Sequence, residues 1–103
     1  MVWGTPFRIE ETVEATGVVR LALEDELDLS TRNAVEVRLH ELSARRAAVC
    51  IDLSRLEFID ASGLRVLVSA FADARRSECS MELDPRLTPQ VSRVLAVADP
   101  QLL

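Results

Sequence analysis

The feature that most constrains the fold is a nearly continuous apolar run at residues 47–53, Ala-Ala-Val-Cys-Ile-Asp-Leu. The run is too short for a helix of ordinary length. Apolar sequence without polar alternation is typical of a strand that is covered on both faces. We therefore expect an α/β domain in which helices cover a mixed sheet and this strand lies near the centre of the sheet.

The rest of the chain supplies the other elements, about four strands and three helices in the order β-β-α-β-α-β-α. The acidic segment at residues 24–29 predicts a solvated loop that is pinned by Leu27 and Leu29, rather than a metal cluster. Ser30 or Thr31 is suited to cap the first helix, because a hydroxyl there can accept a hydrogen bond from an N–H of the first turn. The predicted ranges are about 7–13 and 18–23 for a hairpin with its turn at 14–17, 31–45 for the first helix, 48–53 for the third strand, 62–76 for the second helix, 81–83 for the last strand and 88–98 for the third helix.

Composition narrows the classes of function. A chain of 103 residues forms one small domain, residues 1–103, in which residues 1–6 are expected to be a disordered tail. The net charge of -5 argues against a nucleic-acid partner. No apolar stretch approaches the ~20 residues that a membrane span requires, and the N-terminus has no secretory pattern. We therefore expect a cytoplasmic protein that does not insert into membranes.

The cysteines point to a reducing compartment. Cys50 lies in the apolar run and is expected to pack in the core, whereas Cys79 can be exposed. A disulfide between them is the weaker interpretation. Together with the single His40, which is expected at the surface, they cannot supply a dedicated zinc site.

A polar turn follows the central strand at residues 58–64, Phe-Ile-Asp-Ala-Ser-Gly-Leu. Asp60 is suited to cap the second helix by accepting hydrogen bonds from the N–H groups of Ser62 or Gly63, which stabilises a helix by about 1 kcal/mol. Helix N-termini favour anions, and sites in open α/β sheets form at the carboxyl ends of strands. On the residues alone, the simpler interpretations are that Ser62 fills the first turn and that Gly63 meets a packing requirement.

Enzymatic catalysis is not expected. A serine triad would need His40 beside Ser62, and no pattern in the sequence brings them together. The Gly-x-Ser-x-Gly motif is absent, and the 3 glycines form no phosphate-binding loop. We therefore expect no catalytic residues, no cofactor and no metal site.

Three stretches of the chain resemble the successive signatures of the STAS domain. They are Leu-Asp-Leu-Ser-Thr at residues 27–31, Ile-Asp-Leu-Ser at 51–54 and the turn at 58–64. The likeness extends from about residue 18 to 98 and is greatest to bacterial anti-sigma factor antagonists. There are departures: Asp25 stands where members usually have glycine before Glu-Leu-Asp, the glycine usual after the second helix is absent from residues 77–80, and many members continue beyond Leu103 into a last helix.

The resemblance implies the STAS fold, a mixed sheet of about four strands covered by about three helices, and a regulatory role by partner switching. In that role the unphosphorylated protein binds an anti-sigma factor, which is a serine kinase of the GHKL type. This binding releases the sigma factor for transcription. Phosphorylation of Ser62 would end the binding, and a serine phosphatase would reverse the modification. The partner-binding residues implied by the motif are Asp28, Asp60, Ala61, Ser62, Gly63 and Leu64.

A second function fits the same residues. STAS domains also serve as accessory subunits of membrane transporters, where the domain docks to a permease or an ATPase and is not phosphorylated. The fold and the Ser62 turn would look alike in the two cases. The sequence leaves this alternative open.

Overall fold

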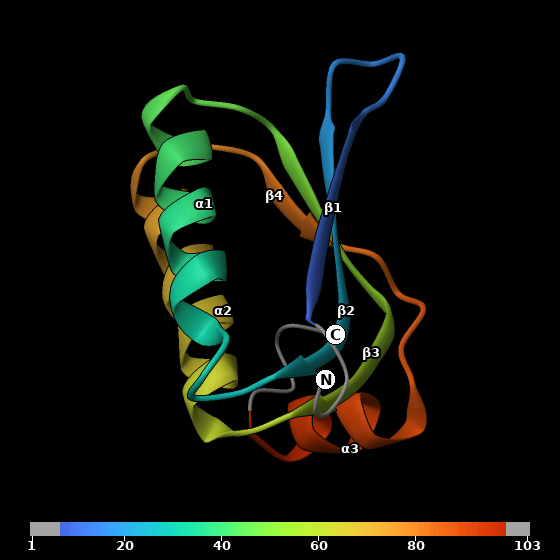
Figure 1. The fold of residues 1–103 in the computed structure, drawn as a ribbon. Helices are drawn as coiled ribbons and strands as arrows, with labels where there is room; N and C mark the ends of the chain where they lie inside the picture. The colour runs from blue at the N-terminus through green and yellow to red at the C-terminus, as the bar shows by residue number, and fades with distance from the viewer. Residues whose placement is uncertain (1–6, 99–103) are drawn as a thin grey trace.

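The computed structural model describes residues 7–98 and has the predicted elements in the predicted order (Figure 1). The tail expected at residues 1–6 and the predicted end of the third helix at Asp99 and Pro100 lie outside the described residues. The elements are β1 (Arg8–Val13), β2 (Val19–Leu27), α1 (Arg32–Ala44), β3 (Val49–Ile59), α2 (Ala61–Arg76), β4 (Met81–Leu83) and α3 (Pro89–Ala98).

The four strands form one mixed sheet in the order β1-β2-β3-β4. The hairpin partners β1 and β2 are antiparallel, while β2 with β3 and β3 with β4 are parallel. Helix α1 connects the first parallel pair and α2 connects the second. The predicted α/β class and the central place of β3 are therefore confirmed.

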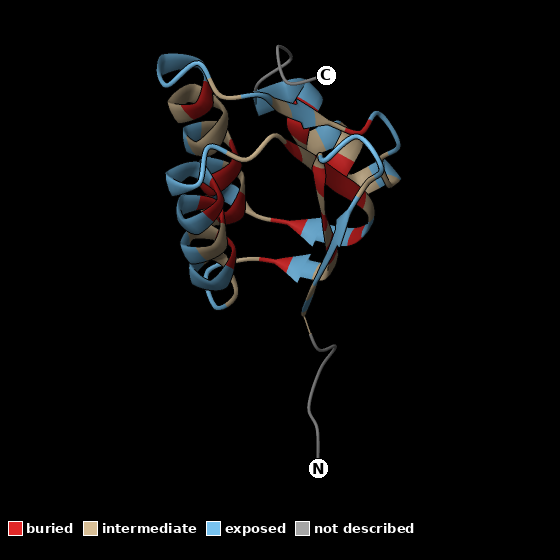
Figure 2. Ribbon diagram, turned by 90° about the horizontal axis from the view of Figure 1, so that it is seen from above, coloured by how far each residue is buried: buried red, intermediate tan, exposed pale blue. Residues whose placement is uncertain are grey.

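The helices lie in two places around the sheet. Helices α1 and α2 lie side by side on one face, and α3 packs against the second half of β3, away from that pair (Figures 1 and 2). Period-two alternation directs Val19, Leu21 and Leu23 of β2 toward the helix pair, where they are buried. The other buried side chains of this core are Leu27, Val35, Leu39, Leu42, Val49, Ile51, Leu53, Leu56, Ile59, Val66, Leu67, Val91 and Leu95.

Strand β3 is longer than the sequence pattern predicts. It continues past Leu53 to Ile59, where a loop was expected, and both Leu56 and Ile59 are buried. Pairing with β2 sustains the extension, through register shifts between Ala22 and Glu24 and between Asp25 and Glu26. The polar turn therefore begins only at Asp60.

The acidic segment is also part of the sheet rather than a loop. Residues 24–27 belong to β2, and Leu27 is fully buried. Leu29, by contrast, is 69% exposed and pins nothing. Asp25, where the family resemblance implies a glycine, has a positive φ of 77°. Left-handed backbone favours glycine, so the backbone of this position would suit the implied residue.

The predicted capping of α1 by a hydroxyl is wrong. The N-cap residue is Thr31, but its side chain makes no capping hydrogen bond. The Thr31 hydroxyl instead donates to the carbonyl oxygen of Glu26 at 2.9 Å and accepts from the N–H of Asp28 at 2.9 Å. Thr31 therefore closes the loop that precedes the helix, and the Ser30 hydroxyl donates to Asp28 in the same loop.

Two further expectations about burial need correction. Cys50 is half-buried and not in the core, because Ile51 and Leu53 occupy the core-facing positions of β3 and their neighbours point the other way. In α3, Val91 and Leu95 are buried as predicted, but Ala98 is exposed at the end of the helix.

The predicted surface position of His40 is confirmed, because this residue is exposed. Both cysteines, Cys50 and Cys79, have free thiols and are half-buried. Over residues 7–98, no group of three side chains is placed to hold a metal ion.

The sequence predicts that helices cover both faces of β3. In the structure, helices cover only part of the face that points away from α1 and α2. The half of that face near Asp52 carries a charged network. Arg20 donates to Asp52 at 3.1 Å, to Asp84 at 2.9 Å and to Glu14 at 2.9 Å, and Arg86 donates to Asp84 at 2.9 Å. These ion pairs compensate the charge of Asp52 and Asp84, which are the buried polar residues of the described chain.

Candidate functional site

The candidate site lies where β2 and β3 end beside each other. Parallel strands bring their carboxyl ends to one edge of the sheet, so the loop after Leu27 and the turn after Ile59 are neighbours. The backbone N–H of Asp60 donates to the carbonyl oxygen of Leu27 at 3.2 Å. The first and third signature stretches of the sequence therefore form one surface.

Asp60 caps helix α2 and also holds Ser62. Its backbone is extended, and its Oδ1 accepts the N–H of Gly63 at 2.9 Å and the hydroxyl of Ser62 at 2.7 Å. The bond from Gly63, followed by that from Ser62, lowers the pKa of the Asp60 carboxyl below its usual range. The predicted capping role of Asp60 is confirmed, with Gly63 as the donor. The cap fixes the direction of the Ser62 hydroxyl as well.

Gly63 is required by close packing. The residue is buried, and a Cβ at this position would lie 2.6 Å from the carbonyl oxygen of Leu27 and 2.7 Å from its Cγ. Any larger residue would push the first turn of α2 away from the end of β2. The glycine thus holds the Ser62 turn against the neighbouring strand.

Asp28 organises the loop that faces this turn. Its Oδ1 accepts the N–H of Ser30 at 3.0 Å and the Ser30 hydroxyl at 2.7 Å, and the Thr31 hydroxyl oxygen lies 3.2 Å from it. These bonds, that from the Ser30 hydroxyl foremost, lower the pKa of the Asp28 carboxyl. The side chain that the family resemblance assigns to the partner surface therefore also shapes its own loop.

The predicted site residues differ in how far they reach the surface. Ala61 is exposed, and Asp28, Asp60 and Ser62 are half-buried. Gly63 is buried, and the half-buried Leu64 packs against the hydrophobic core. The motif therefore brings together residues that present a surface and residues that hold it in position.

A hollow opens beside Ser62, which we call the Ser62 hollow. Arg32 and Glu36 of α1 line one side, and Ser62, Arg65 and Ser69 of α2 line the other. The sequence pattern did not reveal this grouping, because the two sets of residues meet only when α1 and α2 pack side by side. Helical spacing of Ser62, Arg65 and Ser69 was the available signal for one half of it.

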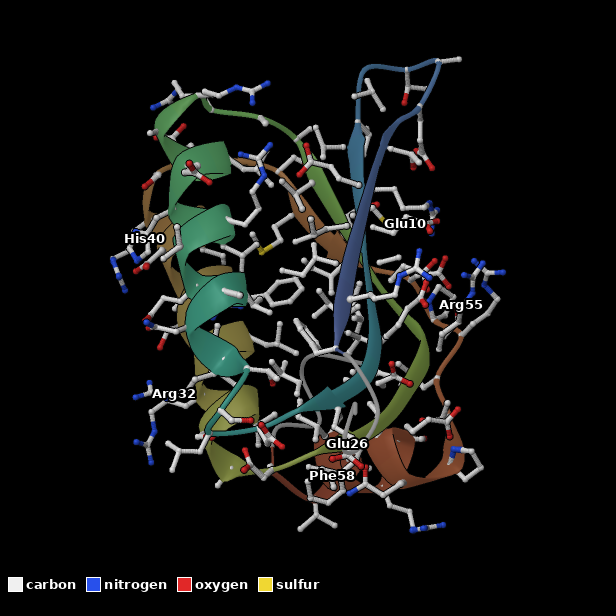
Figure 3. All side chains as sticks on the ribbon, in the orientation of Figure 1. Glu10, Glu26, Arg32, His40, Arg55 and Phe58 are labelled. Carbon is white, nitrogen blue, oxygen red and sulfur yellow. The ribbon has the colours of Figure 1, made fainter. Side chains whose placement is uncertain are left out.

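Two apolar side chains at this end of the molecule were also missed. Phe58 is 39% exposed and Leu29 is 69% exposed. Phe58 pairs with Glu26 across the last residues of β2 and β3, and both lie at the same end of the molecule as Arg32 (Figure 3). The sequence signal was the interruption of the buried pattern between Leu56 and Ile59. These side chains add apolar surface that a protein partner can bury at this end of the molecule.

The site shows no arrangement for serine catalysis over residues 7–98. The side-chain partner of the Ser62 hydroxyl is the Asp60 carboxylate, and no histidine bonds to it in this part of the chain. Among the described helices, none is long and apolar enough to cross a membrane.

Comparisons with known proteins bear on the family and the fold of this chain. The family model described as "Mlab, STAS domain" matches residues 11–100. Comparison with curated proteins finds no significant sequence match.

Among solved structures, an anti-sigma factor antagonist from Mycobacterium paratuberculosis superimposes with a TM-score of 0.81 at 23% identity, covering 93% of this chain and 80% of that one. The Bacillus cell fate determinant SpoIIAA in its phosphorylated form gives 0.68 at 20% identity, covering 91% and 84%. The unphosphorylated form of the anti-sigma factor antagonist SpoIIAA gives 0.67 at 19% identity, covering 90% and 84%. At these identities the structures share the fold, and the family model covers most of the sequence. The chain belongs to the STAS domain family.

Proposed function

We propose that this STAS domain is an anti-sigma factor antagonist of the bacterial cytoplasm that is switched by phosphorylation of Ser62. The unphosphorylated form binds a serine-kinase anti-sigma factor of the GHKL type and releases the sigma factor. The kinase phosphorylates Ser62, which ends the binding, and a serine phosphatase restores the active form. The chain itself performs no catalysis in this scheme.

The observation that carries the proposal is the hydrogen bond of 2.7 Å from the Ser62 hydroxyl to Asp60. The bond directs the hydroxyl proton toward a carboxylate and leaves the lone pairs of the oxygen available for attack on a phosphoryl group. A carboxylate with a lowered pKa is a weak base, so Asp60 acts mainly by orienting the hydroxyl. Ser62 is half-buried at an edge of the sheet, where a partner can approach.

The surroundings of Ser62 explain why phosphorylation would weaken binding. A phosphoserine adds about 1.5–2 negative charges at neutral pH. Leu29 and Phe58 offer apolar surface at this end of the molecule, and a partner that buries it must strip water from the turn as well. An unpaired charge in such a contact costs a few kcal/mol, and each ~1.4 kcal/mol is tenfold in affinity.

The proposal is tested by incubating the purified chain with ATP and each GHKL-type kinase encoded in the same genome. We expect one kinase to bind the chain in calorimetry and to phosphorylate Ser62, as located by mass spectrometry. Ser62→Ala should bind the kinase and remain unmodified. Ser69→Ala is the matched control, because Ser69 lies on the same helix and lines the same hollow.

Two outcomes would contradict the proposal. One is the absence of both binding and phosphorylation with every such kinase, with all proteins folded. The other is phosphorylation that persists in Ser62→Ala. Co-purification of the chain with a permease or a transport ATPase instead would favour the accessory-subunit function of a membrane transporter.

A further inference from the structure

Phosphorylation of Ser62 would change a contact inside the chain. The unmodified hydroxyl donates to Asp60 at 2.7 Å. A phosphoserine has no hydroxyl proton, so the same geometry would place a phosphate against a carboxylate. Like charges at this distance repel, and Asp60 is held in place by its bond to Gly63. The Ser62 side chain can relieve the repulsion by turning to another staggered rotamer.

The Ser62 hollow offers the phosphate a different set of neighbours. Arg65 lies three residues after Ser62 on α2, so the two side chains are neighbours on one face of the helix. Arg32 is the first residue of α1, and its side chain reaches outward at that end of the helix (Figure 3). Both arginines line the hollow with Ser62. A guanidinium group presents a planar fork of donors that matches phosphate oxygens.

Neither arginine is engaged elsewhere in the described part of the chain. The salt bridges of residues 7–98 are made by other arginines, which are Arg8, Arg20, Arg38, Arg55, Arg76 and Arg86. Arg65 is exposed and Arg32 is half-exposed. Their guanidinium groups can therefore move toward a new anion without breaking an ion pair within residues 7–98.

We propose that Arg65 and Arg32 hold phosphorylated Ser62 within its own chain, so that the phosphate lies in the Ser62 hollow and away from Asp60. The inference rests on the proposed phosphorylation of Ser62. It adds a second consequence to the modification. The two arginines, which are free to contact an acidic partner surface before phosphorylation, are neutralised afterwards. The binding surface thus gains a phosphate and loses two available cations.

Acidic groups near the hollow oppose this arrangement and set the design of the test. Asp60 lies beside Ser62, Glu36 of α1 lines the hollow, and Asp28 lies in the adjoining loop. Their effect on the phosphate is common to all variants that keep them. The difference between the parent and an arginine variant therefore isolates the contribution of that arginine.

The test uses protein in which phosphoserine is inserted at position 62 during translation, so that no kinase is needed. The titration of the phosphate is followed by phosphorus NMR in the parent, in Arg65→Gln and in Arg32→Gln. Each substitution should raise the midpoint of the phosphate titration by about 0.2–0.7 of a pH unit, the shift that corresponds to one exposed ion pair. The difference should shrink in 1 M salt, where the Debye length is only about 3 Å.

Arg93→Gln is the matched control, because Arg93 is an exposed arginine on α3 that makes no salt bridge over residues 7–98. Its midpoint should equal that of the parent. Midpoints in Arg65→Gln and Arg32→Gln that match both the parent and this control would overturn the inference. Melting curves of the unphosphorylated variants should match the parent and show that the substitutions leave the fold intact.

Kinase affinity of the same phosphoprotein separates this inference from the proposed function. If the midpoints do not move but affinity still falls on phosphorylation, the arginine inference fails and the function stands. If the midpoints move as expected and no kinase binds either form, the arginines hold the phosphate and the proposed function fails.

Discussion

Replacing Gly63 with alanine tests how the Ser62 turn is held, and even the sign of the effect is informative. In an ordinary helix interior, alanine is more favourable than glycine by about 0.8–1 kcal/mol. At this position the new Cβ would lie 2.6 Å from the carbonyl oxygen of Leu27 and 2.7 Å from its Cγ. One obstacle is backbone and the other belongs to a fully buried side chain, so neither can yield cheaply. Overpacking of this kind costs about 1–3 kcal/mol or more.

Contacts of 2.6 and 2.7 Å place the steric cost in the upper part of that range, at about 2–3 kcal/mol, so the expected net destabilisation is about 1–2 kcal/mol. Urea denaturation followed by circular dichroism measures it as a lower midpoint with an unchanged slope. Ser69→Ala on the exposed face of the same helix is the control and should be neutral or slightly stabilising. A Gly63→Ala protein that is as stable as the parent would show that the end of β2 does not confine the turn.

Three further predictions follow from the same contacts. Asp25→Gly should stabilise the domain by about 1 kcal/mol in thermal melts, because Asp25 has a φ of 77°, which glycine adopts without strain. A lower melting temperature would refute this account of the Asp25 backbone. Near neutral pH, Asp60→Asn should melt at the same temperature as the parent, because asparagine caps a helix as well as aspartate does. The same substitution should slow the phosphorylation of Ser62. An unchanged rate of phosphorylation would mean that Asp60 acts only as a cap. The pKa values of Asp28, Asp60 and Asp84 are all lowered in the folded state. Their stabilisation is therefore complete above the unfolded pKa of about 4 and is lost as pH falls below it, so melting temperatures should drop below pH 4 and drop less steeply in Asp60→Asn.

The sequence correctly predicted the cap of α2 and the hairpin turn, which depend on residues that are close together in the chain. The cap at Asp60 follows from an acceptor placed just before an amphipathic run, and it forms as expected with Gly63. The hairpin follows from alternation around a glycine, and Gly17 has a positive φ of 90° in that turn. Each of these features requires only neighbours in sequence.

Two of the errors, the length of β3 and the acidic segment of β2, concern features that depend on pairing between distant segments. Leu56 and Ile59 do not alternate regularly with polar residues, and their extended conformation is sustained by β2 across the sheet. The same pairing draws the acidic residues 24–26 into a strand, despite the low strand propensity of Asp and Glu. The orientation of Cys50 was available from the sequence, because period-two alternation with Ile51 and Leu53 places it on the other face.

Only part of the group of residues around Ser62 was predictable from the sequence, because some of its members are adjacent in the chain and others are not. The motif identified Asp60, Ser62 and Gly63 because they are adjacent in sequence. Arg32 became a neighbour of Arg65 only through the packing of α1 on α2, which no local pattern specifies. The cationic side of the hollow therefore required the structure.

The contacts that hold the turn are largely independent of the Ser62 hydroxyl. The bond from the Asp60 N–H to Leu27 joins the ends of β2 and β3, and the bond from the Gly63 N–H to Asp60 caps α2. Gly63 also fits closely against Leu27. None of these contacts needs the hydroxyl proton that phosphorylation removes. A phosphate at Ser62 would thus change the charge and shape of the surface while the turn beneath it stays in place, so switching by this residue requires no refolding of the domain.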